Sequence, residues 1–268
     1  MEPHVTQRDL KGSVRSYLPD ELSTAAVAAA KVGHVVSVVI PAKDEGSTVA
    51  GVIEAIRPHL AGCGGGLIDE ILVVDDGSSD DTARNAERAG ATVLQLEGGG
   101  GKGAAMAAGV GSACGDLLVF LDADVENTSP DYIPRLLGPL VFDEDVMLVK
   151  GHYVRPIDGH PTGGGRVTEL TARPALRLLF PALTDVLQPL AGETAMRREA
   201  VDKIGLDTGY RVEMGILIDT LRTFGPGSIA QVDLGVRLHR NRPIEELSEM
   251  ATEVLAAALE RSDLSTLR

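Results

Sequence analysis

The stretch EILVVDDGSSDDTARNAERAG, residues 70–90, decides the fold class. An apolar run rich in β-branched residues ends in a cluster of Asp, Gly and Ser, and a helix-forming segment follows the cluster. Nearly continuous apolar runs are typical of strands that are buried on both faces of a parallel sheet. The stretch therefore predicts a strand, a polar loop and a helix that returns the chain for the next strand.

The same order recurs along the chain. Four more apolar runs are predicted strands with helical segments between them: VVSVVI (35–40), ATVLQL (91–96), DLLVFLD (116–122) and VMLVKGHYV (146–154). We expect an α/β fold, with a Rossmann-like, mostly parallel sheet flanked by helices. Right-handed crossovers make such a sheet doubly wound, and its ligands bind at the carboxyl ends of the strands.

The chain divides into three predicted regions. Residues 1–34 are expected to be a helical extension, residues 35–155 a nucleotide-binding unit, and residues 156–268 a region that begins with a glycine-rich joint. Apolar residues spaced three and four apart predict an amphipathic helix over roughly residues 243–262, which packs against the body or against a partner subunit.

Composition excludes several classes of function. The net charge of −14 and the low aromatic content of 3%, with no Trp, disfavour nucleic acids and anionic membranes as partners. No run reaches the roughly twenty apolar residues of a membrane helix, and no signal peptide is evident, so we expect a cytoplasmic protein. A phosphate ester bound here would need a local positive site made by a metal or by clustered Arg and Lys.

Polar clusters follow three of the predicted strands: PAKDE (41–45), DDGSSDD (75–81) and DADVEN (122–127). Each cluster alone is compatible with an ordinary turn or helix cap. Three clusters at one edge of a sheet favour a binding site there. Asp122 and Asp124 project to the same side of an extended chain, so they are suited to a hard divalent cation, held directly and through water. Two capping aspartates in a turn are the alternative.

The glycine run LEGGGGKGAAMAAG, residues 96–109, fails the test for an ATP-binding P-loop. That motif needs Ser or Thr after Gly-Lys and a glycine five residues earlier, but Gly103 and Leu96 stand there. Lys102 and Gly103 are instead expected at the nucleotide, near a helix N-terminus with positive potential. The preceding glycines are expected to be a mobile connection.

Two later segments supply positive charge. RLHRNRP, residues 237–243, surrounds His239 with three arginines in an otherwise acidic chain. A neutral histidine is a good metal ligand, and arginines bind phosphate oxygens with paired donors. GGGR before Thr168 suits an anionic ligand, because glycines expose backbone N–H groups and Arg166 adds charge. A solvated basic patch and a flexible joint are the alternatives.

These motifs resemble a known family. The strand ends, the GKG element and the Asp-x-Asp pair resemble family-2-type nucleotide-sugar glycosyltransferases of the GT-A fold. GGGRVTELTARP, VLQPLAGE, GYRVEMGILIDT and IAQVDLGVRLHRNRP, in this order, are similar to the glucosyl-3-phosphoglycerate synthases of actinobacteria. The resemblance covers roughly residues 30–262. It implies a hexosyltransferase that moves glucose from UDP-glucose to the 2-hydroxyl of 3-phosphoglycerate, with retention and with Mg²⁺ or Mn²⁺, and it implies a homodimer.

The resemblance also implies residue roles. The nucleotide-sugar site would comprise Pro41, Ala42, Glu45, Asp76, Lys102, Asp122, Ala123, Tyr210, Glu213, Arg237 and Arg242, with Glu193 also near the hexose. The acceptor site would comprise Gly165, Arg166, Val167, Thr168 and Asn241. Asp124 and His239 would be the metal ligands, and Asp122, Leu190 and Glu213 the catalytic residues. The region 156–268 is accordingly expected to bind the acceptor.

The charge that develops when the anomeric bond breaks suggests a mechanism. Breaking the anomeric bond leaves negative charge on the diphosphate, which the cation, Arg237 and Arg242 would stabilise. No carboxylate stands out as a nucleophile, so same-face attack is expected, with the departing phosphate accepting the acceptor's proton.

The chain is shorter than is typical of this family. The segment RPIDGHPT makes a short connection to the GGGR motif and borders the expected acceptor site. Another small anionic acceptor, or another donor such as GDP-mannose, is therefore the alternative. A sugar-nucleotide nucleotidyltransferase is disfavoured because PAKDEGST lacks the glycine- and arginine-rich motif of those enzymes. A noncatalytic nucleotide-binding module is disfavoured because the set of metal ligands is complete.

Overall fold

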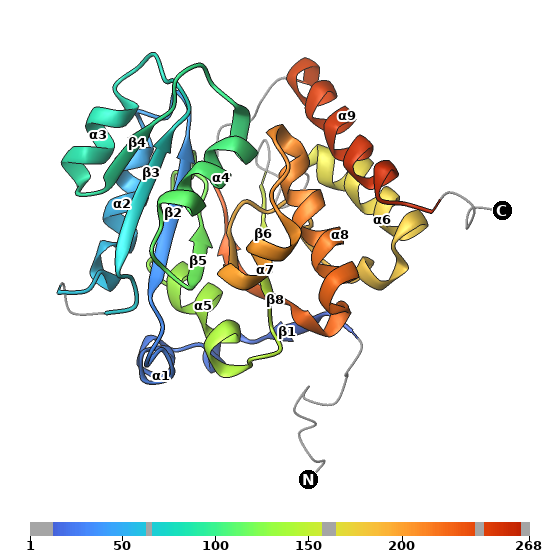
Figure 1. The fold of residues 1–268 in the computed structure, drawn as a ribbon, viewed down its shortest axis with the longest axis horizontal. Coiled ribbons are helices and arrows are strands. Elements are labelled where there is room, and N and C mark those ends of the chain that lie inside the picture. Colours follow the sequence, from blue (N-terminus) through green and yellow to red (C-terminus); the bar gives the residue numbers. More distant parts are fainter. Residues whose placement is uncertain (1–12, 63–65, 157–164, 239–243, 264–268) are drawn as a thin grey trace, which may run out of the picture.

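A computed structural model gives the structure of residues 13–62, 66–156, 165–238 and 244–263, which are the residues described below (Figure 1). Their strands form one eight-stranded sheet in the order β1-β8-β6-β7-β5-β2-β3-β4. The strands are β1 (Arg15–Tyr17), β2 (Val36–Ala42), β3 (Glu70–Asp75), β4 (Thr92–Gln95), β5 (Leu117–Phe120), β6 (Leu148–Val154), β7 (Thr194–Arg197) and β8 (Ile229–Val236). The sheet is mixed, because β7 runs antiparallel to β5 and β6 while the other pairs are parallel.

Helices cover both faces of the sheet (Figure 1). They are α1 (Thr24–Ala30), α2 (Val49–Ile56), α3 (Thr82–Ala89), α4 (Gly101–Ser112), α5 (Tyr132–Phe142), α6 (Arg173–Leu179), α7 (Arg198–Ile204), α8 (Val212–Phe224) and α9 (Ile244–Glu260). One core lies under α1, α2, α3 and α5, and the other lies under α4 and α6 to α9. Successive strand residues point to opposite faces, so Val38 and Ile40 enter the first core and Val39 the second. This is why the strands read as continuous apolar runs.

The α/β architecture and the five predicted strands are confirmed, and so is the C-terminal helix, which is α9. The helical extension expected over residues 1–34 contains α1, but its described part is not helical throughout. Residues 15–17 form the edge strand β1, which pairs with β8 from the other end of the chain. Strands from all three predicted regions join one sheet, and the three-region division itself stays a prediction.

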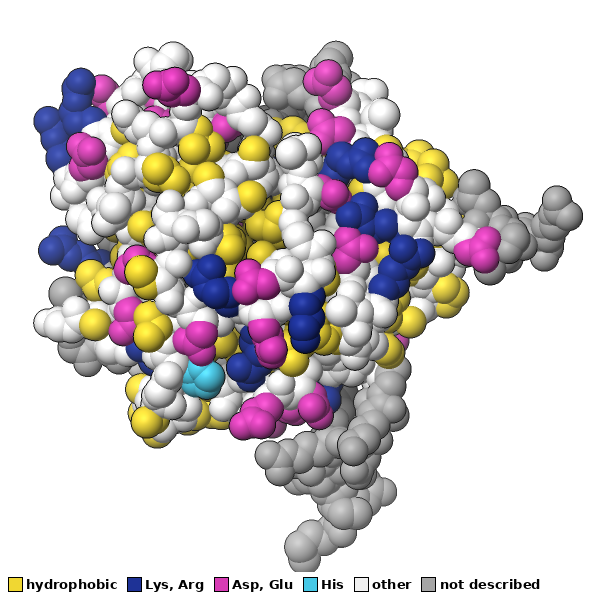
Figure 2. Space-filling view, in the orientation of Figure 1, with side chains coloured by type: hydrophobic (Ala, Val, Ile, Leu, Met, Phe, Trp, Pro, Cys, Tyr) yellow, Lys and Arg dark blue, Asp and Glu magenta, His cyan; other side chains and the backbone are white. Residues whose placement is uncertain are grey.

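None of the helices in the described ranges has the length and apolar character needed to cross a bilayer. The face drawn in Figure 2 carries Lys and Arg side chains interspersed with Asp and Glu. No continuous basic patch is visible among the described residues of that face.

Candidate active site

A cavity of about 840 Å³ lies at the carboxyl ends of the strands. Of the predicted site residues within the described ranges, all but Gly103 and Glu193 line it: Pro41, Ala42, Glu45, Asp76, Lys102, Asp122, Ala123, Asp124, Gly165, Arg166, Val167, Thr168, Leu190, Tyr210, Glu213 and Arg237. The predicted residues His239, Asn241 and Arg242 lie outside the described residues. The topology thus brings residues from the end of β2, from the loops that follow other strands and from α4 and α8 to one place.

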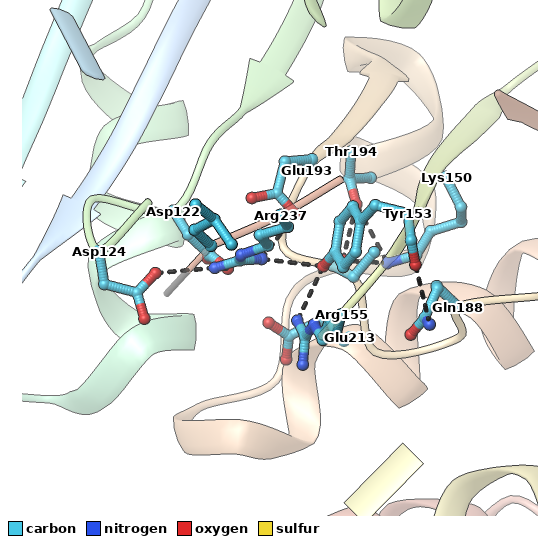
Figure 3. A network of polar contacts seen from close by, with 12 residues as sticks. Asp122, Asp124, Lys150, Tyr153, Arg155, Gln188, Glu193, Thr194, Glu213 and Arg237 are labelled. Atoms are coloured by element: carbon cyan, nitrogen blue, oxygen red, sulfur yellow. Dashed lines mark hydrogen bonds and ion pairs between the residues drawn. The ribbon is translucent and has the colours of Figure 1, made fainter. Parts of the chain in front are cut away.

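Arg237 joins the two aspartates of the Asp-x-Asp pair. Its Nη2 donates to Asp122 Oδ2 at 2.8 Å and to Asp124 Oδ1 at 2.7 Å (Figure 3). Its Nη1 donates to Glu193 Oε2 at 2.9 Å, and the side chain is only 2% exposed. A guanidinium so deeply buried is tolerated because three carboxylates offset its charge.

Lys102 stands on the other side of Asp122. Its Nζ is 2.6 Å from Asp122 Oδ1 and 2.5 Å from Glu213 Oε1. Burial opposes the charge of Lys102 and of Asp122, but the mutual attraction prevails. The pKa of Lys102 is therefore held well above its usual range, and Lys102 and Arg237 hold the pKa of Asp122 well below its usual range. Both groups are charged at neutral pH.

The glycine run has a different role from the expected one. The backbone N–H groups of Gly100 and Gly101 donate to the Asp76 carboxylate at 2.7 and 2.9 Å, and both glycines line the cavity. Gly103 does not line it; a Cβ there would lie 1.9 Å from the carbonyl oxygen of Asp207. The expectation that only Lys102 and Gly103 act at the site is therefore wrong: Gly103 permits close packing, and the two preceding glycines hold Asp76.

Asp122 and Asp124 fit a hard divalent cation. Both carboxylates reach the same cavity and already share a positive group, Arg237. The described residues contain no group of three His, Cys, Asp or Glu side chains that could complete a metal site alone. The predicted second ligand, His239, lies outside the described residues.

The acceptor stretch forms one end of the cavity. Gly165 has a φ of +79°, and the chain then enters the helical segment of Thr168–Ala172 that precedes α6. Val167 and Thr168 are buried in the wall. This turn places the backbone of residues 165–168 at the cavity, as the GGGR motif predicts.

Several residues that line the cavity were not among the predicted site residues. They are Lys43, Asp44 and Ala105, Arg155 at the end of β6, Gly209, and four residues of α9: Leu247, Met250, Glu253 and Val254. Glu253 Oε2 accepts from the backbone N–H of Tyr210 at 2.6 Å. The amphipathic spacing of α9 predicts that it packs, but not that it forms a wall of the site. Glu193, predicted near the hexose, is instead fully buried behind Arg237 and does not line the cavity.

This fold and this site define a nucleotide-sugar glycosyltransferase of GT-A type. Residues 37–205, more than half of the chain, match the glycosyl transferase family 2. The chain belongs to this family, among the relatives of the glucosyl-3-phosphoglycerate synthases.

Several curated relatives carry that name. The synthase of Mycolicibacterium smegmatis is 46% identical over 248 residues, which are 88% of this chain and 80% of the relative. The synthase of Petrotoga mobilis is 43% identical over 206 residues, 73% of this chain and 63% of the relative. The solved synthase of Mycobacterium tuberculosis in complex with Mn²⁺, UDP-glucose and phosphoglyceric acid has a TM-score of 0.84 at 41% identity, covering 94% of this chain and 88% of that one. The same enzyme has also been solved with Mg²⁺ and UDP.

Proposed function

We propose that this protein is a hexosyltransferase that moves glucose from UDP-glucose to the 2-hydroxyl of 3-phosphoglycerate, with Mg²⁺ or Mn²⁺ as cofactor. The observation that carries the proposal is the cavity itself. It unites the predicted donor residues, the Asp122–Asp124 pair and the acceptor stretch in a chain whose relative is solved with Mn²⁺, UDP-glucose and phosphoglyceric acid.

The uridine part of the donor would bind to residues at the carboxyl ends of the strands. Pro41, Ala42 and Glu45 after β2 would line the uridine pocket. Asp76, fixed by the glycine N–H groups, would accept from the uracil. A carboxylate held by two backbone donors is pre-organised, so little conformational entropy is lost when the base binds.

The residues around the carboxylates would stabilise the leaving diphosphate. Asp124, with His239, would hold the cation, which supplies Lewis-acid stabilisation of the developing phosphate charge. Arg237 and Lys102 lie beside Asp122 and can add positive charge to the same place. Arg242 would contribute from the predicted RLHRNRP motif.

Same-face attack is the mechanism that the charges favour. Asp122 is paired with Lys102 and Arg237, and Glu213 with Lys102. Carboxylates engaged in ion pairs are weak nucleophiles, so a covalent glycosyl-enzyme is disfavoured. Leu190, which lines the cavity, would orient the hexose and acceptor, and the product would keep the donor's anomeric configuration.

A homodimer acting in the cytoplasm completes the proposal. Leu255 and Leu259 on α9 and Leu178 on α6 are exposed, and exposed apolar side chains on neighbouring helices suit an interface between copies. The exposed free thiol of Cys114 suits a reducing compartment. Light scattering at assay concentration tests the dimer.

The experiment that tests the function is a release assay for nucleoside diphosphate with a panel of UDP- and GDP-sugars. Each sugar is tested with and without 3-phosphoglycerate, and with and without Mg²⁺. We expect turnover only when UDP-glucose, 3-phosphoglycerate and the metal are present together. Metal-dependent consumption of UDP-glucose that is indifferent to 3-phosphoglycerate would remove the acceptor assignment.

A further inference from the structure

The acceptor in the proposed function has two separate anionic groups, a carboxylate and a phosphate. The residues predicted for it offer only one cation, Arg166, together with hydroxyl, amide and backbone donors. A second anionic group that enters a partly closed cavity needs its own positive partner, because desolvating an unpaired carboxylate is costly.

Arg155 is a second arginine at this end of the cavity. It follows β6, and its Nη1 lies 3.7 Å from the place that a Cβ on Gly165 would occupy. Arg155 and the stretch 165–168 therefore line the same part of the cavity. The motif comparison gave Arg155 no role.

A buried tyrosine holds Arg155 in place. Nη2 of Arg155 donates to Tyr153 Oη at 2.8 Å, and its guanidinium lies 5.0 Å from the centre of the Tyr153 ring. Burial raises the pKa of Tyr153 to about 12, so its hydroxyl stays neutral in the working pH range. Within the described part of the chain no carboxylate forms an ion pair with Arg155, and its buried Nε has no hydrogen-bond partner. The guanidinium is thus held in place, and the buried carboxylate of Glu193 acts on it from beyond ion-pair distance.

The same tyrosine hydroxyl also connects Arg155 to the reaction centre. Nη1 of Arg237 donates to Tyr153 Oη at 2.8 Å, and Nη2 of Arg237 binds Asp122 and Asp124 (Figure 3). One hydroxyl therefore separates Arg155 from the arginine beside the predicted metal ligand. In 3-phosphoglycerate the carboxyl carbon is bonded directly to the carbon with the reactive hydroxyl, whereas the phosphate is one carbon further away. The anionic group nearer the reaction centre is the carboxylate.

We propose that Arg155, held by Tyr153, binds the carboxylate of the acceptor and thereby selects acceptors that carry a carboxylate beside the attacking hydroxyl. The glycine turn with Arg166 and Thr168 is left for the phosphate. This inference rests on the proposed function and names the part of the chain that recognises one group of its acceptor.

The test compares two ligands that differ in this group. Calorimetric titration measures the Kd of 3-phosphoglycerate and of glycerol 3-phosphate, which lacks the carboxylate, in the presence of UDP and Mn²⁺. In the unchanged enzyme we expect 3-phosphoglycerate to bind more tightly. Arg155→Gln should raise the Kd of 3-phosphoglycerate about tenfold to a hundredfold, because a charge-assisted hydrogen-bonded pair is lost. The Kd of glycerol 3-phosphate should stay within about twofold of its value in the unchanged enzyme. Arg155→Lys should restore part of the preference, and Tyr153→Phe should lose part of it.

Arg177→Gln, which removes an exposed arginine of α6, is the matched control and should change neither Kd. The UDP affinity of each variant reports whether the fold and the donor site are intact. Equal weakening of both ligands by Arg155→Gln would assign Arg155 to the phosphate and overturn the proposal, and so would no weakening of either. If the unchanged enzyme fails to glucosylate 3-phosphoglycerate, the proposed function itself fails, which the turnover assay shows separately.

Discussion

Gly192 lies directly against the carboxylate of Asp122: a Cβ on Gly192 would be 2.0 Å from Asp122 Oδ1. The loop before β7 therefore leaves no room for any side chain at this position unless Asp122 moves. Because Asp122 also binds Lys102 and Arg237, a displacement would disturb both ion pairs.

We predict that Gly192→Ala lowers kcat by at least about a hundredfold, since a misplacement of about 1 Å at a catalytic group has this effect. The measurement is steady-state turnover of UDP-glucose, with the thermal transition as a check on folding. Gly111→Ala in α4 is the control, because a Cβ there meets nothing within 4 Å, and it should keep full activity. Normal kcat in Gly192→Ala would show that the position of Asp122 is not critical.

Asp124 offers a test of the predicted metal site that does not depend on turnover. Asp124→Asn replaces a charged oxygen ligand by a neutral one, so we expect Mn²⁺ to bind more than about tenfold more weakly in the presence of UDP. Calorimetry or the electron paramagnetic resonance signal of free Mn²⁺ measures the affinity. Asp131→Asn, on the surface, should bind Mn²⁺ normally. Unchanged affinity in Asp124→Asn would assign the metal to other residues.

Lys150 gives stability a pH dependence of known sign. It is buried in β6, with Nζ 2.6 Å from the Ala191 carbonyl and 3.0 Å from Thr194 Oγ1 (Figure 3). Burial, helped by the charge of Lys102, lowers the pKa of Lys150 to about 8 against the opposing charges of Glu213, Glu193 and Asp122. The unfolded chain keeps the ordinary pKa of 10.5, so it binds more protons than the folded chain between about pH 8 and 10.5.

The buried charge of Lys150 therefore lowers the free energy of unfolding below pH 8, and this destabilisation decreases as the pH rises to 10.5. The free energy of unfolding of the unchanged protein, minus that of Lys150→Met, should rise across this window by up to roughly 3 kcal/mol. Urea unfolding at pH 7.5 and pH 10 measures both values. Lys203→Met is the exposed-lysine control. A difference that stays constant or falls with pH would contradict a depressed pKa for Lys150.

Glu253 connects α9 to Tyr210, a predicted donor-site residue in the cavity. Its Oε2 accepts from the N–H of Tyr210, and a Cβ on Gly209 would lie 2.4 Å from the same oxygen. We expect Glu253→Ala to raise the KM for UDP-glucose about tenfold, because a hydrogen bond to a charged group is lost and Tyr210 is released. Glu253→Gln should lose less, since it keeps an acceptor oxygen. Glu249→Ala, exposed on the same helix, should have a normal KM. Equal KM values in Glu253→Ala and Glu249→Ala would show that the contact between Glu253 and Tyr210 does not affect binding of UDP-glucose.

Local patterns made part of the site predictable. Asp122 and Asp124 stand two residues apart after an apolar strand, so their common direction follows from strand geometry. Arg155 and Glu253 have no such local pattern: one is a single arginine at a strand end, and the other lies on a helix where acidic residues usually face solvent. Their roles arise from contacts with residues far away in the chain. The strands β1, β7 and β8 were not predicted. For β1 and β7 the reason is that three or four residues acquire a partner only in the folded sheet, whereas β8 has eight residues.

The proposed glucosyl transfer is best tested on the product formed from UDP-[¹³C]glucose and 3-phosphoglycerate. We expect one glucosyl-3-phosphoglycerate for each UDP released, linked to the 2-oxygen and with the α configuration of the donor, as read from the anomeric ¹³C signal. Free glucose as the main product, glucose on a different acceptor only, or a β-linked product would rule out the proposed reaction.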